Sequence, residues 1–284
     1  MSSYYALVAG LPNIAFDDNK LPYTVESFKK EIDNQLSKSD KKLTDLFFLK
    51  YDNSNLLSFL KDPDSSLDPK GNLSSAALNE LVQAVKEQSN IGKQIPSYFI
   101  PFISAYLEEK PQTSVSWEDQ LSSLYYAYAM KCGNAFVADW FELNLNINNI
   151  LTAFTCRKYG LDKNRYIVGD NEVAEAIRNS SARDFGLTDL VDYFPLLQRI
   201  SDESDLKERE RKIDQLKWNW LEENTFFHYF TVEMIFAYIL KLEIIERWAT
   251  LDKETGEDIF REIIRELKQG SVSSLEEFKR NNNK

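Results

Sequence analysis

Hydrophobic residues recur every three or four positions along most of the chain, which is the spacing that places them on one face of a helix. The strongest example is the stretch 226–248, where apolar residues cover more than half of the helix circumference. We therefore predict one long and mostly buried helix there, with other helices packed on several of its sides. Its recurring apolar positions are Val232, Ile235, Phe236, Ile239, Leu242 and Ile245.

The same periodicity predicts helices throughout the rest of the chain. Only 9 Gly and 8 Pro occur in 284 residues, so turns are few and elements are long. The fold class predicted from both observations is all-α. The first two helices are expected to begin near Thr24 and Asp40. Further helices are expected at about 75–85, 97–107, 117–128, 134–157, 170–179 and 188–195. An exposed helix or connector at 202–217 and an amphipathic helix at 252–267 should follow, before a polar tail at 273–284.

Charge and cysteine content narrow the partners and the compartment. The net charge of −11 argues against a nucleic-acid backbone or an anionic lipid surface as partner. Cys132 and Cys156 are too few for a disulfide framework, so we expect buried free thiols in a reducing, cytoplasmic setting. The N-terminus lacks the features of a signal peptide. The longest uncharged stretches, 94–107 and 143–156, are too short to span a bilayer, so we expect a soluble chain without direct lipid insertion.

Two segments of the chain align with each other without gaps. Residues 44–57 match 138–151, and each is predicted to form a helix, a brief polar break with an Asx cap, and a second helix. We interpret this as a duplicated helical unit, with chance similarity between two amphipathic helix pairs as the alternative. A third copy is expected within 202–250. The identical pairs are Asp45/Asp139, Phe47/Phe141, Leu49/Leu143, Asn55/Asn149 and Leu57/Leu151.

These motifs resemble a known family. The Asp/Asn-x-x-Asn-Leu/Ile-Leu break resembles the repeated motif of the C (or d) subunits of A- and V-type ATPases, and in the second copy it leads to Arg157-Lys-Tyr-Gly160, which is similar to the family pattern. The stretch 230–238, Phe-Thr-Val-Glu-Met-Ile-Phe-Ala-Tyr, followed by Glu243 and Arg247, is similar to the family's long helix. The N-terminus departs from the family because it lacks the usual Arg. The chain therefore resembles a divergent bacterial relative of this family.

The resemblance implies a fold, a role and partners. The fold would be a funnel of repeated helical bundles, here a single domain of units at about 1–110, 111–200 and 201–284. The protein would be a non-catalytic central-stalk subunit that links the shaft of a V-type ATPase to the membrane rotor ring in proton or sodium transport. It would lie on the cytoplasmic face of the membrane, held by the central-stalk subunits and the ring rather than by lipid.

Three residues of the repeated motif are candidates for structural or interface roles. Asn55 and Asn149 are expected to cap or bridge helices and so to serve the fold rather than binding. Arg157 is expected to bond helix-end carbonyls, with an acidic partner as the alternative.

Three further candidates lie on the long helix predicted at 226–248. Glu243 and Arg247 are four positions apart, so we expect an ordinary helix ion pair, with a role at a partner surface as the alternative. Tyr238 is expected in the buried core. Core packing is also favoured over an interface for the aromatic stripe of Tyr125, Tyr126 and Tyr128.

The sequence lacks the usual signatures of catalysis. His228 is the single histidine and lies among aromatic residues, so a packed or partly exposed side chain is favoured over a metal ligand. No phosphate-binding loop is present, because Glu87 stands where the first Gly before Gly92-Lys93 would be needed. We therefore expect no metal, no cofactor and no enzymatic activity.

Two other functional classes stay open. A helical-repeat scaffold of an unrelated complex would form an open superhelix. A helical enzyme that uses buried carboxylates on a small substrate would need a cavity with converging carboxylates of perturbed pKa.

Overall fold

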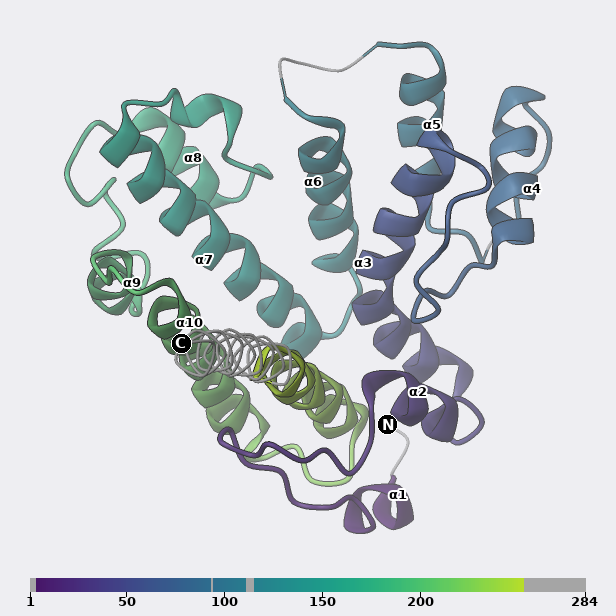
Figure 1. Cartoon of the computed structure of the whole chain (residues 1–284), viewed down its shortest axis with the longest axis horizontal. Coiled ribbons are helices and arrows are strands. Elements are labelled where there is room, and N and C mark those ends of the chain that lie inside the picture. Colours follow the sequence, from purple (N-terminus) through teal and green to yellow (C-terminus); the bar gives the residue numbers. More distant parts are fainter. Residues whose placement is uncertain (1–3, 93, 111–114, 253–284) are drawn as a thin grey trace, which may run out of the picture.

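The computed structural model describes residues 4–92, 94–110 and 115–252, and every regular element within them is a helix (Figure 1). This confirms the predicted all-α class for the described part of the chain. The amphipathic helix expected at 252–267, apart from residue 252, and the tail at 273–284 lie outside the described residues. The elements are α1 (Tyr5–Ala9), α2 (Val25–Ile32), α3 (Lys38–Lys61), α4 (Ser75–Lys86), α5 (Phe99–Leu107), α6 (Trp117–Ala129), α7 (Ala135–Tyr159), η1 (Lys163–Arg165), α8 (Glu172–Asn179), α9 (Phe194–Ser201), α10 (Leu206–Thr225) and a last helix at 232–252.

Polar side chains at the helix ends account for where the long helices start and stop. The Ser37 hydroxyl accepts the Asp40 N–H in the first turn of α3, and the Asn134 side chain accepts the Val137 N–H in the first turn of α7. Gly160 ends α7 in the left-handed conformation, with φ of 66°, which costs glycine little. The predicted stop at Gly160 is therefore observed.

Two predicted helix boundaries are wrong, each for a local reason. The long helix begins at 232 rather than 226, because the chain reverses direction after α10 and Phe230 takes a positive φ of 57° in that turn. Phe226, Phe227 and Tyr229, which were predicted to begin the helix, lie in this turn and are exposed. The helix predicted from Thr188 begins only at Phe194, because Pro195 fits the first turn of a helix and not its end.

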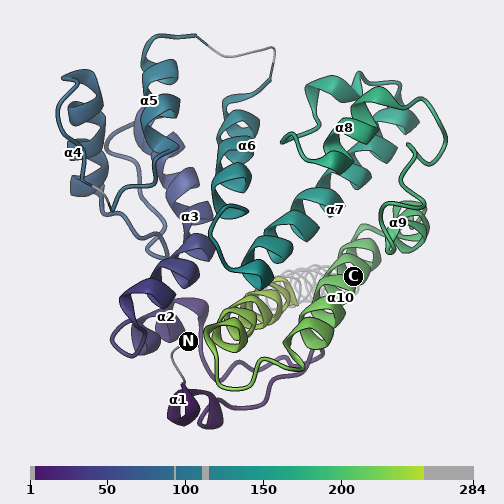
Figure 2. The same cartoon turned by 180° about the vertical axis from the view of Figure 1, so that it is seen from behind.

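Four helices meet in the centre of the core. The Tyr125 hydroxyl of α6 donates to the Leu46 carbonyl of α3 at 2.8 Å. The Tyr125 ring lies 5.4 Å from that of Phe141 on α7, which in turn lies 6.3 Å from Phe236 of the 232–252 helix. Tyr125 thus belongs to the core, as predicted, whereas Tyr128 is partly exposed. From this meeting point α3 and α7 diverge on either side of α6 (Figures 1 and 2).

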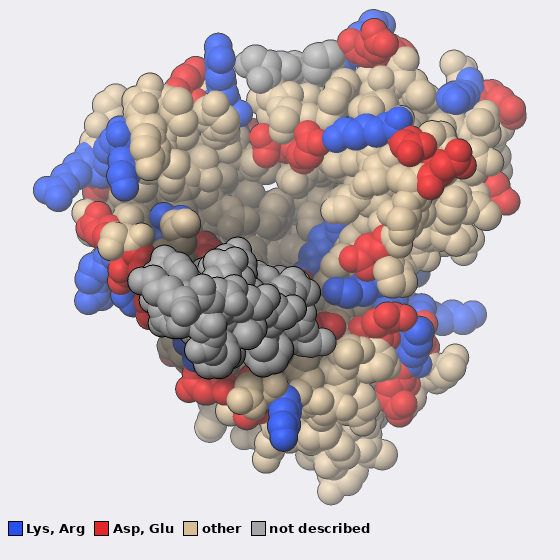
Figure 3. All heavy atoms as spheres, viewed as in Figure 1, with Lys and Arg blue, Asp and Glu red and all other residues tan. Residues whose placement is uncertain are grey.

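The helices form a ring of successive contacts whose middle is filled by the core, because α7 packs directly on the 232–252 helix through Phe141 and Phe236. Successive contacts join α3 to α6, α6 to α7, α7 to α9 and α9 to α10. Ion pairs then join α10 to the 232–252 helix and that helix back to α3. Figure 3 shows a hollow on this face, between the side of the molecule that holds α7 and α8 and the side that holds α3 to α6. The units predicted at about 1–110, 111–200 and 201–284 remain a prediction. The first two each contain a shorter helix, α2 or α6, followed by a helix of 24 or 25 residues.

The N-terminal segment fastens the last helix to the beginning of the chain. The Tyr4 amide donates to the Phe230 carbonyl at 2.7 Å, and the Val25 amide at the start of α2 donates to Glu246 at 3.1 Å. Between them, the Tyr238 hydroxyl donates to the Pro12 carbonyl at 3.1 Å. These bonds close the ring through residues far apart in sequence. No helix in the described part of the chain is long and apolar enough to cross a membrane.

Replacing Tyr238 should separate ring packing from its hydrogen bond. The ring is buried and lies 5.0 Å from that of Phe28. Tyr238→Ala should lower the free energy of unfolding by about 2–5 kcal/mol, because it leaves a cavity in the core. Tyr238→Phe keeps the ring and loses one hydrogen bond, so it should cost only about 0.5–1.5 kcal/mol. Urea unfolding of both variants tests this, and equal losses would contradict the packing role.

Candidate functional site

Asn55 lies in the middle of α3 and binds the loop that follows the helix. Its side chain accepts the Asp68 N–H at 2.8 Å and donates to the Asp68 carbonyl at 3.0 Å. The asparagine is only 3% exposed. One side chain thus satisfies both main-chain polar groups of a loop residue that has no partner strand or helix.

Asn149 makes the same pair of bonds in α7. Its side chain accepts the Val168 N–H at 2.9 Å and donates to the Val168 carbonyl at 2.7 Å, and the residue is 1% exposed. The two asparagines therefore occupy equivalent positions, mid-helix, and each bridges its helix to the returning loop. We call these two sets of bonds the asparagine clamps.

The polar break predicted in each repeat is wrong. Both α3 and α7 pass through the motif without interruption. Asp52 does not cap a new helix but accepts the Asn72 and Leu73 N–H groups at 2.7 and 2.8 Å, just before α4. At the matching position, Asn146 accepts the Asn171 side chain at 2.8 Å, at the start of α8. The Asp52 and Asn146 side chains thus contact the loops beside their helices, and each helix continues past them.

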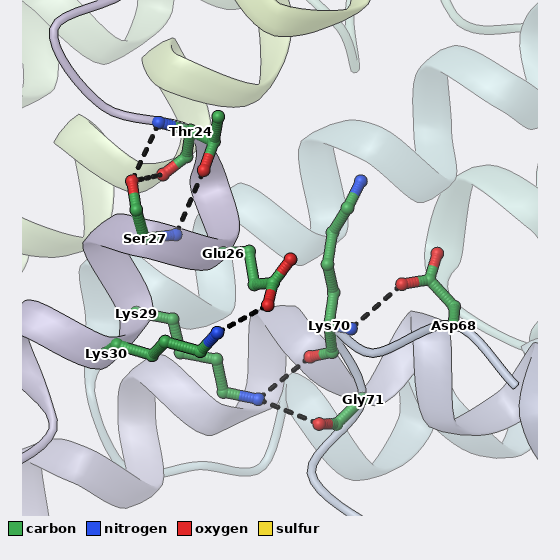
Figure 4. Close-up of polar contacts among 8 residues, drawn as sticks. All are labelled: Thr24, Glu26, Ser27, Lys29, Lys30, Asp68, Lys70 and Gly71. Atoms are coloured by element: carbon green, nitrogen blue, oxygen red, sulfur yellow. Dashed lines mark hydrogen bonds and ion pairs between the residues drawn. The ribbon is translucent and has the colours of Figure 1, made fainter.

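The first loop is held from a second side by α2. The Lys29 ammonium group donates to the carbonyls of Lys70 and Gly71 at 2.8 and 3.0 Å (Figure 4). Gly71 leaves no room for a side chain, because an added Cβ would lie 2.7 Å from the amide nitrogen of Asn55 and 2.8 Å from an oxygen of Asp52. The loop therefore needs glycine where it crosses α3.

Glu243 binds α3 rather than its own helix. Its carboxylate pairs with the Lys50 ammonium group and accepts the Tyr51 hydroxyl at 3.2 Å. Arg247 pairs with Asp214 of α10 and lies 3.7 Å from Glu210. The ion pair predicted between Glu243 and Arg247 is therefore wrong, because each side chain finds an opposite charge on a neighbouring helix.

These ionic contacts form a partly buried seam between α3, α10 and the 232–252 helix. Burial lowers the pKa of Lys50, which the neighbouring Glu243 carboxylate opposes. Burial likewise lowers the pKa of Lys217 on α10, and Asp214 opposes it. The Trp248 indole N–H donates to Asp214 at 2.8 Å, so this buried carboxylate binds both Trp248 and Arg247. The seam joins three helices and leaves its carboxylates occupied by protein groups.

Arg157 binds main-chain carbonyls, but those of a turn rather than of a helix end. Its guanidinium donates to the Arg183 carbonyl and, at 2.7 Å, to the Ala182 carbonyl between α8 and α9. It also lies 3.8 Å above the Phe185 ring. The arginine therefore fastens a second loop to α7, beyond the asparagine clamp.

The described residues contain no cluster of three or more His, Cys, Asp and Glu side chains that could hold a metal ion. His228 is partly exposed, with its Nδ1 3.8 Å from a Glu233 oxygen and its ring 5.7 Å from that of Phe136. Both cysteines are free, Cys156 buried and Cys132 half-buried. The side chains described above pack the core and hold the loops against the helices.

Several residues of the site could not be singled out from the sequence. Asp52 and Asn146 fall at the same position of the gapless match between 44–57 and 138–151, and this shared position was the available signal. No sequence pattern pointed to Lys50 or Asp214, because their partners Glu243 and Arg247 are distant in sequence.

The described residues form an all-helical fold in which buried asparagines on long helices bind the loops that follow. The chain belongs to the family described as "Protein of unknown function (DUF2764)", whose model matches residues 1–271. No curated protein and no solved structure matches the chain.

Asp52→Asn should change how stability depends on pH. Burial raises the pKa of Asp52 to about 6 from 3.8, while the Leu73 and Asn72 N–H donors lower it. The folded chain then holds this proton more tightly than the unfolded chain. The contribution of Asp52 to the free energy of unfolding is therefore largest below about pH 4 and is lost as pH rises to about 6.

The variant copies Asn146 of the second unit and removes this titration. The unfolding free energy of the wild type minus that of Asp52→Asn should fall by about 1–3 kcal/mol between pH 4 and pH 7. Urea unfolding at a series of pH values measures the difference. A difference independent of pH would show that Asp52 titrates alike in both states.

Proposed function

We propose that the chain is a non-catalytic central-stalk subunit of a V-type ATPase or ATP synthase, which links the shaft to the membrane rotor ring during proton or sodium transport. The observation that supports this best is the closed series of contacts by which the last described helix returns to the first long helix, α3. A funnel of helical bundles is what the resemblance of the 44–57 and 138–151 motifs to the C (or d) subunits implies.

The proposed role needs a stiff body rather than reactive side chains. A rotor subunit passes torque between two partners, and close-packed interiors transmit strain because they are hardly compressible. The asparagine clamps fix the loops after α3 and α7, while Glu243 and Arg247 hold the 232–252 helix to α3 and α10. Each of these contacts limits the movement of a helix against the segments that pack on it.

The closure of the ring favours this role over an open scaffold. In an open superhelix the first and last repeats would contact only their sequence neighbours. Here the N-terminal segment bonds the turn before the last helix, and the Lys50–Glu243 pair joins the first and third units. The two ends of the chain's helical array therefore meet.

The buried carboxylates also favour a non-catalytic role over the enzyme considered above. In the described part of the chain the buried ones are Asp52, Asp214 and Glu233. Asp52 accepts main-chain amides, and Asp214 is bonded by Trp248 and Arg247. Glu233 accepts the Asn134 amide at 2.7 Å through Oε1, while its buried Oε2 has no hydrogen-bond partner among the described residues. They act inside the fold instead of converging on a substrate cavity.

The partners follow from charge as well as resemblance. A chain of net charge −11 is repelled by the anionic leaflet of a membrane. We therefore assign its membrane association to protein contacts on the cytoplasmic face, with the rotor ring and the central-stalk subunits as partners.

Purification from native membranes tests the proposal. Tagged chain from detergent-solubilised membranes should bring down the central-stalk subunits and the ring of the V-type ATPase. A low-ionic-strength wash should release it with the soluble sector or leave it on the ring. Tyr238→Ala should weaken the complex through its destabilised core, whereas Tyr238→Phe should retain it. Monodisperse chain found only in the cytosol, in cells whose assembled ATPase lacks it, would refute the proposal.

A further inference from the structure

A groove of about 860 Å³ runs along the C-terminal half of α7, beside α9 and the start of α10. Its charge is opposite to that of the whole chain. Two acidic side chains, Asp202 and Glu210, line it, and Glu210 lies 3.7 Å from Arg247. The basic side chains that line it are Arg157, Lys158, Arg183 and Arg209.

The cations of this groove are available to a ligand. Arg157 donates to uncharged carbonyls, so its positive charge is not neutralised. Lys158, Arg183 and Arg209 form no ion pair with an acidic side chain among the residues that the structure describes. A chain with 45 acidic and 34 basic residues has ample carboxylates to pair with, yet leaves this face basic.

Large apolar side chains lie among these cations and face solvent. Tyr159 is 66% exposed and Leu206 is 65% exposed, and Leu161 and Tyr166 line the same groove with nearly half of their surface free. Contiguous exposed apolar surface with a polar rim marks interaction sites. Tyrosine and arginine are also the residues enriched where proteins bind one another.

We propose that this groove binds an acidic segment of a partner protein, one that carries leucine or aromatic side chains between its Asp and Glu residues. Opposite charge selects the acidic segment and orients it, while burial of Tyr159 and Leu206 supplies the apolar contact. The exposed aliphatic side chains of Leu161 and Leu206 favour a peptide with apolar side chains over a nucleic acid, whose bases stack on aromatic rings. The inference requires neither the rotor ring nor the shaft.

Peptide binding to the full chain tests the proposal. A fluorescein-labelled synthetic peptide of alternating Glu-Glu-Leu and Glu-Glu-Phe units should bind in an anisotropy titration, more weakly as salt is raised. The double variant Arg183→Glu/Arg209→Glu should weaken binding by about tenfold or more, and Leu206→Ser should weaken it as well. All of these residues are at least partly exposed, so unchanged thermal unfolding should show that each variant folds.

A matched control carries the same change of net charge elsewhere. Lys86→Glu/Lys131→Glu alters two exposed lysines outside the groove and should leave binding unchanged. The proposal is overturned if the wild type does not bind the peptide or if both double variants lose binding equally. Tighter binding of a Lys-for-Glu peptide or of a single-stranded RNA oligonucleotide also overturns it. So does a dimer in sedimentation velocity that the Arg183→Glu/Arg209→Glu variant abolishes, which would assign the groove to a second copy.

Discussion

A buried asparagine that binds both main-chain groups of one loop residue is the interaction on which the rest of the fold depends. Asn55 does this for Asp68 and Asn149 for Val168. Without the amide side chain, a half-buried N–H and C=O would be left without partners, at a cost of about 1–3 kcal/mol for each group. Because the clamp fixes the loop against the middle of a long helix, it also fixes where α4 and α8 begin.

The two clamped units are joined into a ring by a different kind of contact. Aromatic rings fill the meeting point of α3, α6 and α7, whereas the closing helix at 232–252 is held at its far end by ion pairs to Lys50 and Asp214. Charged pairs that are half-buried add little net stability, but they are directional. They specify which helix lies next to which, and hydrophobic packing supplies most of the free energy.

The sequence was sufficient for the helical class, for most helix positions and for the equivalence of Asn55 and Asn149, because these follow from local spacing and from the aligned motif. It was misleading about the motif's conformation, since a polar cluster inside a helix has the same composition as a cap. The partners of Glu243 and Arg247 could not be predicted. Glu243 and Lys50 are 193 residues apart in the sequence, and Arg247 and Asp214 are 33 apart. Local spacing does not show how such distant helices pack together.

Native-state hydrogen exchange at the Asp68 and Val168 amides tests the clamp most directly. Both amides lie in loops, where exchange is normally fast, yet each donates to a buried asparagine. The account predicts that both are protected nearly as well as helical amides. Asn55→Ala should remove protection at Asp68 while leaving Val168 protected, and Asn149→Ala should do the reverse. Exchange of both amides at the rate of exposed loop amides in the wild type would contradict the account.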